Sequence, residues 1–153
     1  MEAVLTIDTS GEWWVGTEAN DIREFLIAYE AEGYPVHETR VCTCGCGSVS
    51  FKFSADRDEG CAQRICVSCG AAHFIGDSEE YWEEAEPEAW QCGCGSKTCN
   101  VGVGYALRKA DLGKQPDVRW ISIGNRCTNC GTLGSFVDWK IDYGPSYHLL
   151  DRA

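Results

Sequence analysis

The segment VCTCGCGS, residues 41–48, holds three cysteines that are separated by single residues, namely Cys42, Cys44 and Cys46. Thiolates are ligands of zinc and iron, and a closed tetrahedral zinc site takes four ligands. Such sites are usually built from two pairs of cysteines that are distant in the sequence. Three closely spaced cysteines are therefore one more than a pair requires. The rest of the chain has to show which two bind a metal ion and what the third one does.

An internal repeat sorts the cysteines. The segment CGCGS occurs at 44–48 and again at 92–96, and RICVSCG at 64–70 corresponds to NRCTNCG at 125–131. Each half of the chain therefore reads Cys-x-Cys-Gly-Ser, a spacer, and Cys-x-x-Cys-Gly, with spacers of 19 and 32 residues between the inner cysteines. Self-similarity of this kind indicates two copies of one structural unit.

The repeat assigns eight of the eleven cysteines to two metal sites, and it selects Cys44 and Cys46 over Cys42. Each pair is followed by a glycine, which can adopt the positive φ of a tight turn. The predicted ligands of two Zn²⁺ ions are Cys44, Cys46, Cys66 and Cys69 in the first site, and Cys92, Cys94, Cys127 and Cys130 in the second. Four thiolates also suit iron or an iron–sulfur cluster, but two closed sites with tight glycine turns favour structural zinc.

This arrangement resembles the zinc-ribbon family over residues 42–76 and 90–143. The resemblance implies a β-hairpin plus a third strand around each metal ion, and it implies little about function. One difference from the family matters, because its first pair is usually Cys-x-x-Cys, whereas both halves here have Cys-x-Cys. Cys42 is therefore the alternative ligand to Cys44.

The three remaining cysteines have separate expected roles. Cys99 occupies the position in the second half that Phe51 occupies in the first, so we expect a buried apolar residue. Cys42 is expected at the end of the strand that enters the first site. Cys61 is expected at a hairpin tip, where its thiol would contribute little packing.

The stretch 20–33 predicts an amphipathic helix that packs on the first ribbon, with Asp21 and Glu24 in a capping box and Gly33 at its end. The acidic stretch 78–90 predicts a short helix, with an ordered linker as the alternative. The C-terminal tail is apolar enough that we expect it to dock on the domain.

These elements together predict a small, metal-stabilised, mostly β member of the α+β class. We divide it into an N-terminal strand and helix at 1–40 and a first zinc ribbon at 41–76. An acidic connector at 77–91 and a second ribbon with the C-terminal tail at 92–153 complete the chain. At 153 residues this is one ordinary domain or two small ones.

The charge is strongly negative and uneven. The chain has 24 acidic and 13 basic residues, a formal net charge of −11. Residues 76–91 contain seven acids and no base, whereas 92–136 contain six bases and two acids. The start of the chain lacks a basic region followed by an apolar run, so we expect a cytoplasmic protein with reduced cysteines. A secreted disulfide scaffold is the disfavoured alternative, because the number of cysteines is odd.

The leading hypothesis is a non-enzymatic, zinc-stabilised protein that binds a protein with a basic surface, in the manner of an inhibitor or toxin-immunity protein. The alternative is nucleic-acid binding through the second ribbon, although a negative chain repels phosphate. The candidate residues for that alternative are Lys97, Arg108, Lys109, Lys114, Arg119 and Arg126, with Tyr105 and Trp120 as stacking faces.

An enzyme is the least favoured class. The three histidines, His37, His73 and His148, form no recognisable catalytic pattern, and a closed zinc site has no open position for a substrate. A nucleophilic Cys42 or Cys61, or a redox pair of Cys42 and Cys44, is the residual enzymatic hypothesis.

Overall fold

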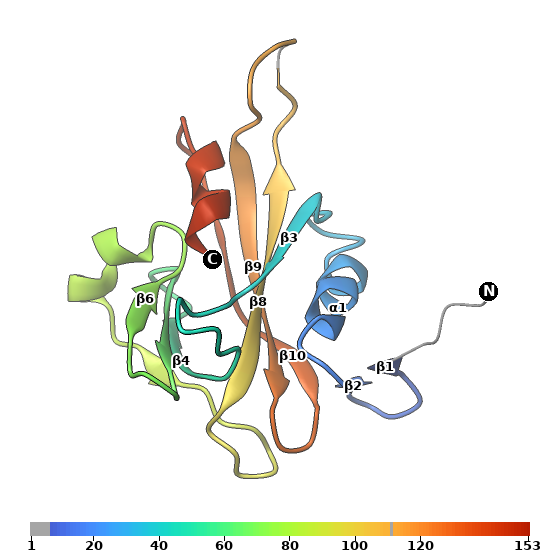
Figure 1. Cartoon of the computed structure of the whole chain (residues 1–153). Coiled ribbons are helices and arrows are strands. Elements are labelled where there is room, and N and C mark those ends of the chain that lie inside the picture. The colour runs from blue at the N-terminus through green and yellow to red at the C-terminus, as the bar shows by residue number, and fades with distance from the viewer. Residues whose placement is uncertain (1–6, 111) are drawn as a thin grey trace.

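The computed structural model describes residues 7–110 and 112–153, and the protein is mostly β, as the sequence predicts (Figure 1). Most strands belong to one antiparallel sheet with the order β10-β9-β8-β4-β5-β6, in which β3 also pairs with β8 and β7 with β4. The strands of this sheet are β3 (Glu38–Val41), β4 (Phe51–Asp56), β5 (Cys61–Cys66), β6 (Ala72–Phe74), β7 (Glu88–Ala89), β8 (Cys99–Leu107), β9 (Val118–Cys127) and β10 (Leu133–Lys140). A small hairpin, β1 (Ile7–Asp8) and β2 (Val15–Gly16), precedes the helix α1 (Asp21–Tyr29).

The order of the strands in the sheet is symmetric about the boundary between the two halves of the repeat. The first half forms the hairpin β4–β5 plus β6, and the second half forms β8–β9 plus β10. The halves meet where Phe51 of β4 pairs with Cys99 of β8, and these two residues occupy equivalent positions in the repeat. An antiparallel pair of equivalent residues places an approximate two-fold axis between the two halves.

The halves also exchange their leading strands. The strand before the first Cys-x-Cys pair, β3, pairs with β8 of the second half, with Val41 opposite Gly102. The strand before the second pair, β7, pairs with β4 of the first half, with Ala89 opposite Ser54. These are equivalent positions of the repeat, so each half completes the sheet of the other.

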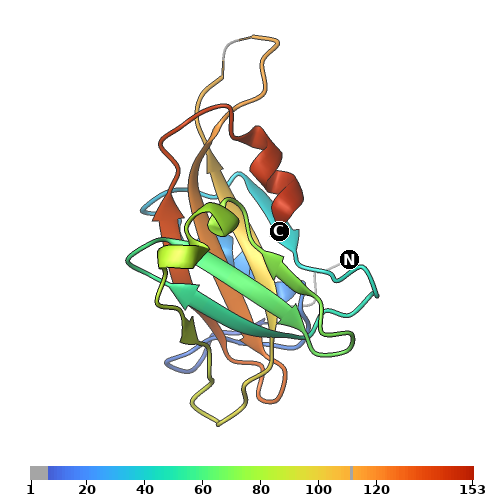
Figure 2. The same cartoon turned by 90° about the vertical axis from the view of Figure 1, so that its left-hand side faces the viewer.

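The main hydrophobic core lies between the two halves. The β4–β5 hairpin folds across one face of β8–β9–β10, as the second view shows (Figure 2). Phe53 and Ala62 from the first half and Val103, Ile121 and Ile123 from the second are fully or almost fully buried in this cluster. One core that draws on both halves makes them parts of a single folded unit.

The helix α1 covers the opposite face of β8, β9 and β10, and not the first half as expected (Figure 1). Ile22 and Leu26 are completely buried there. Ile22 lies directly over Gly102 and Gly124, where a Cβ atom would collide with it. The strands β4 and β5 contain no glycine, so only the second half offers a surface that the helix can approach this closely.

The helix begins at Asp21, within the predicted stretch, but its N-terminal capping and its C-terminal end differ from the prediction. It ends at Tyr29, four residues before Gly33, and the N-cap residue Asn20 makes no side-chain capping bond. Asp21 does not form the predicted capping box, since its Oδ2 accepts hydrogen bonds from the backbone N–H groups of Thr17 at 2.8 Å and Glu18 at 3.2 Å. The carboxylate therefore fixes the turn before the helix.

The acidic connector forms two short 3₁₀ helices, η1 (Ser78–Glu80) and η2 (Trp82–Glu84), in place of the single short helix predicted over 78–90. Adjacent glutamates repel one another, and Trp90 anchors the far end of the segment by packing in the core at 9% exposure. The last 3₁₀ segment, η3 (Tyr147–Arg152), buries Leu149 and Leu150, which confirms that the tail docks. None of the helices within the described residues has the length and apolar character needed to cross a membrane.

Candidate metal centres

The structure brings the eight predicted cysteines together as two groups of four. In the first group, the sulfur of Cys44 lies 3.5 Å from that of Cys69, and Cys46 lies 3.6 Å from Cys66. In the second group, the corresponding distances are 3.5 Å from Cys92 to Cys130 and 3.6 Å from Cys94 to Cys127. All four sulfurs of each group lie within 4.8 Å of one another.

These separations distinguish a metal site from a disulfide. A disulfide holds its sulfurs about 2.05 Å apart. Four sulfurs at about 2.3 Å from a tetrahedral zinc ion lie about 3.8 Å from each other. The observed 3.5–3.6 Å contacts are close to the tetrahedral value and far from the disulfide value. Each group is therefore arranged to hold one metal ion.

The Cys-x-Cys-Gly-Ser motif closes a turn in the same way in both halves. The backbone N–H of Cys44 donates to the carbonyl of Ser48 at 2.9 Å, and that of Gly47 donates to Cys44 at 2.8 Å. The second half repeats both bonds at Cys92 and Gly95. Gly47 and Gly95 have φ of +92° and +95°, which confirms the predicted left-handed glycines.

The Cys-x-x-Cys-Gly motifs form a second pair of matching turns. The N–H of Gly70 donates to the carbonyl of Cys66, and that of Gly131 donates to Cys127, both at 2.9 Å. The two glycines have φ of +76° and +78°. Because the first and last cysteine of each motif start and close this turn, their side chains lie on the same side of it and face the other pair.

Hydrogen-bond donors beside three of the eight sulfurs favour the thiolate form that a metal ion requires. The backbone N–H of Cys69 lowers the pKa of Cys66 to about 6. The backbone N–H of Ser96, helped by the side-chain amide of Asn129, lowers the pKa of Cys94 to about 6. The hydroxyl of Thr132, 3.1 Å from the sulfur of Cys130, lowers the pKa of that thiol as well.

Cys42 lies outside the first group and fills a core position. Its side chain is 1% exposed, and its backbone N–H donates to the carbonyl of Val101 at 2.8 Å. Its counterpart in the second half is Trp90, which donates in the same way to Phe53 at 2.8 Å. Burial raises the pKa of the Cys42 thiol to about 12. Cys42, the third cysteine of the 41–48 segment, is therefore an apolar core residue. It directly follows β3, the strand of the first half that pairs with β8 of the second half.

The other two cysteines are also buried. Cys99 is completely buried beside Phe51, which confirms its expected apolar role. Cys61 lies next to the β4–β5 hairpin turn, as expected, but it is completely buried as the first residue of β5, so the expectation that its thiol contributes little packing is wrong. Gly60, with φ of +71°, makes the turn immediately before it.

Arg126 has a role that the sequence did not suggest. Its Nε donates to the carbonyl of Gly16 at 2.9 Å, and its Nη1 donates to Oδ1 of Asn100 at 3.0 Å. The amide of Asn100 in turn donates to the carbonyl of Val49 at 2.8 Å, in the loop of the first cysteine group. This chain of hydrogen bonds joins the N-terminal hairpin, the second half and the first metal loop.

Several residues proposed for nucleic-acid binding are occupied within the protein. Tyr105 is completely buried and cannot stack on a base. Trp120 stacks on Tyr34 with ring centroids 4.1 Å apart, and the guanidinium of Arg119 lies 5.0 Å over the same tyrosine. Arg108 donates to the carbonyl of Ile141 at 2.7 Å. Lys97, Lys109 and Lys114 remain exposed.

Two of the three histidines contact backbone groups and do not face each other. His37 Nδ1 accepts from the backbone N–H of Leu107 at 2.9 Å, and His73 Nε2 lies 3.1 Å from the carbonyl oxygen of Arg152. Neither contact brings an imidazole to a cysteine group.

No protein-family model, curated protein or solved structure matches this chain. The class of the protein therefore rests on its two groups of four cysteines. Each group is arranged to hold a metal ion, which is the arrangement of a metal-binding protein.

Proposed function

We propose that the two cysteine groups hold structural Zn²⁺ in two zinc-ribbon units, and that the protein works without catalysis by binding a protein with a basic surface. Each group supplies four sulfurs and closes the tetrahedron, so a bound zinc ion has no open position for a substrate. Zinc would link the two turns of each half and hold the ends of its hairpin together.

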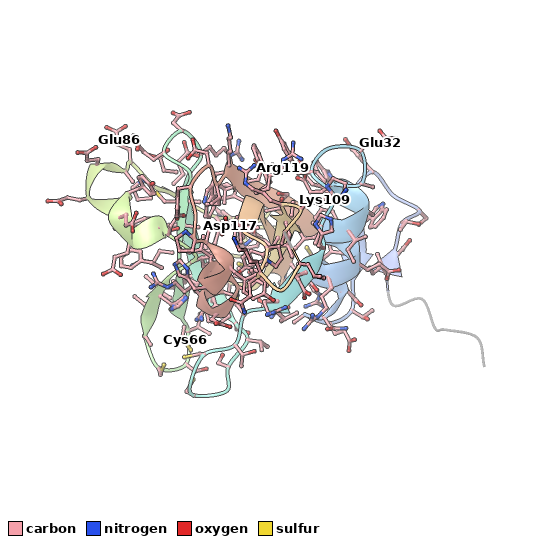
Figure 3. All side chains as sticks on the ribbon, turned by 90° about the horizontal axis from the view of Figure 1, so that it is seen from above. Glu32, Cys66, Glu86, Lys109, Asp117 and Arg119 are labelled. Carbon is pink, nitrogen blue, oxygen red and sulfur yellow. The ribbon has the colours of Figure 1, made fainter. Side chains whose placement is uncertain are left out.

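The observation that supports the binding function is an acidic ridge in which Arg57 is the one base among the described residues. The ridge consists of Asp58, Glu59, Glu79, Glu80, Glu83, Glu84, Glu86 and Glu88, all of which are exposed. The backbone N–H groups of Asp58, Glu59 and Glu86 all donate to the Asp56 carboxylate, so the two segments of the ridge are adjacent. Figure 3 places Glu86 at the edge of the molecule, away from Lys109 and Arg119.

The ridge charge is not neutralised within the protein. Between residues that the structure describes, one ion pair forms, from Arg40 Nη1 to Glu38 Oε2 at 3.2 Å. Arg57 is the one base within the ridge, and its Nε donates to the carbonyl of Phe136 while its guanidinium lies 4.9 Å over that ring. A concentrated, unpaired negative surface attracts and steers a cationic partner. A basic cleft of the kind found in nucleases fits this description.

The test compares two sets of charge-neutral variants in binding to partners captured from the host. Glu79→Gln, Glu83→Gln and Glu84→Gln remove three ridge charges, and the matched control Glu18→Gln, Glu32→Gln and Asp151→Asn removes three exposed charges elsewhere. We expect the ridge variant to lose a salt-sensitive partner that the control variant keeps. Equal binding by both variants, or tight binding of an oligonucleotide, would overturn the proposal.

A further inference from the structure

A groove runs between the N-terminal hairpin, the second metal loop and α1. It consists of two adjoining hollows of about 510 and 420 Å³ that share Trp13, Leu133 and Gly134. The first hollow borders the second cysteine group and includes Trp90 in its wall. The second lies against α1. We call the two hollows together the tryptophan groove.

The groove exposes aromatic surface that a folded protein ordinarily buries. Trp13 is 64% exposed and Tyr29 is 57% exposed. Tyr29 stacks on Phe25 at 5.6 Å between centroids, and Phe25 meets Trp14 edge-on at 6.0 Å, so this aromatic wall is held in place. Exposed aromatic side chains held in place in this way are available to pack against a partner.

The charge of the groove is negative or neutral throughout. Among its described lining residues there is no lysine or arginine, and Glu12 is the charged one. Cys92, Cys94 and Cys130 of the second group line the first hollow. If that group holds zinc, as proposed above, four thiolates and one divalent ion leave a charge of −2 beside the two tryptophans.

The wall of the first hollow includes a residue whose hydrogen-bond acceptor has no donor. Asn125 is 1% exposed and forms part of the hollow's lining. Its Nδ2 donates to the sulfur of Cys99 at 3.6 Å, and its Oδ1 has no partner among the described residues. A buried polar atom in this state is exceptional, and a ligand that donates a hydrogen bond would satisfy it.

We infer that the tryptophan groove binds a segment of the basic partner in which an arginine side chain enters the first hollow and an apolar side chain enters the second. A guanidinium stacks on indole faces, is attracted by the thiolate charge, and offers five N–H donors to sulfur and amide acceptors. An anionic ligand would meet repulsion from the sulfurs and from Glu12. This inference rests on the proposed binding of a basic protein, and it assigns the place where the partner is anchored.

The test uses the zinc-loaded full chain and a short capped peptide with one arginine and one leucine. We expect the indole N–H signals of Trp13 and Trp90 in the nuclear magnetic resonance spectrum to shift and saturate as the peptide is added. Replacing the arginine by neutral, isosteric citrulline should weaken binding about tenfold. Unshifted indole signals at millimolar peptide, or equal affinity for the two peptides, would overturn the inference.

Two variants and one control locate the site. Trp13→Ala removes an exposed ring and should weaken peptide binding about tenfold. Gly134→Val adds a branched side chain at a residue that lines both hollows, where a Cβ meets nothing within 4 Å, and it should abolish binding. The control Leu112→Ala changes an exposed side chain in the loop between β8 and β9, outside both cysteine groups and both hollows, and should leave binding unchanged. If Gly134→Val does not fold, Trp13→Ala decides the matter, since its ring is mostly exposed.

The same variants separate this inference from the proposed function. If the ridge variant loses the partner while Trp13→Ala and Gly134→Val bind it like the unaltered protein, the groove is not the anchor and the proposed function stands. If the ridge variant keeps the partner at every salt concentration, the proposed function itself fails. Loss of the partner in both the ridge and the groove variants, with two metal ions retained, supports both.

Discussion

Adding a single methyl group at Gly124 should loosen the contact between α1 and the sheet. A Cβ atom at this position would lie 2.7 Å from Cγ2 of Ile22 and 3.1 Å from Cγ of Leu26. Carbon atoms pack best at about 3.5–4.0 Å, so Ile22 would have to move by about 1 Å. Both side chains are completely buried, which leaves no space for that movement.

The size of the effect follows from two opposing contributions. Overpacking of a core costs about 1–3 kcal/mol, whereas replacing glycine by alanine stabilises by about 0.4–1 kcal/mol through the unfolded chain. Gly134 on the neighbouring strand is the matched control, because a Cβ there meets nothing within 4 Å. We therefore expect the free energy of unfolding of Gly124→Ala to be about 2 kcal/mol lower than that of Gly134→Ala.

Urea unfolding followed by tryptophan fluorescence, on protein shown to contain two metal ions, measures this difference. The double variant Ile22→Ala, Gly124→Ala provides a rescue, because the shortened side chain leaves room for the new methyl group. Ile22→Ala should therefore cost less in the Gly124→Ala background than in the unaltered protein, with a coupling of about 1–2 kcal/mol. Equal stability of the two glycine variants, or additive effects in the double variant, would refute the close packing of Ile22 in α1 against Gly124.

Elemental analysis should find two zinc ions per chain and one in Cys44→Ser, whereas Cys42→Ser should keep both and lose about 1–3 kcal/mol of stability through its buried hydroxyl. Loss of a metal ion from Cys42→Ser but not from Cys44→Ser would reverse the ligand assignment. Burial, together with Asp138, raises the pKa of Glu30 above its usual 4.5, so the folded protein holds this proton more tightly and loses stability as the pH rises through the raised value. Glu30→Gln should accordingly be more stable than the unaltered protein at pH 7, and this difference in stability should shrink towards pH 5. Urea unfolding midpoints at both pH values measure the difference. A difference that grows on acidification would show that the pKa of Glu30 is lowered and not raised. A strong chelator under reducing conditions should lower the unfolding midpoint sharply in circular dichroism, and an unchanged midpoint in metal-free protein would show that the core alone specifies the fold.

The metal groups could be predicted because their signal is local and repeated. Four motifs of five residues contain the ligands and the glycines of their turns, and the spacing within each motif decides which side chains meet. The role of Cys42 was also within reach of the sequence. Extending the repeat by two residues aligns it with Trp90, and a position that takes either cysteine or tryptophan is typical of a core and not of a metal ligand.

The misplaced features depend on contacts between distant segments. The apolar stripe of the helix shows which of its faces is buried, but not which part of the sheet it packs against. The space that Ile22 occupies forms only because the register of β8 and β9 places Gly102 beside Gly124. The exchanged strands β3 and β7 have four and two residues, too few for a periodic pattern. The burial of Cys61 depends in the same way on how the β4–β5 hairpin folds over the second half.

The exchange of leading strands makes the two metal centres thermodynamically dependent on each other. Binding of a metal ion at the first group would fix the loop that follows β3, and β3 is hydrogen-bonded to β8, which starts five residues after Cys94 of the second group. The converse holds through β7 and β4. An ion at either centre would therefore lower the cost of ordering the other, and by reciprocity each ion would raise the affinity of the other centre by the same factor. Zinc should load and leave this protein in pairs, so that singly occupied chains are scarce during a titration.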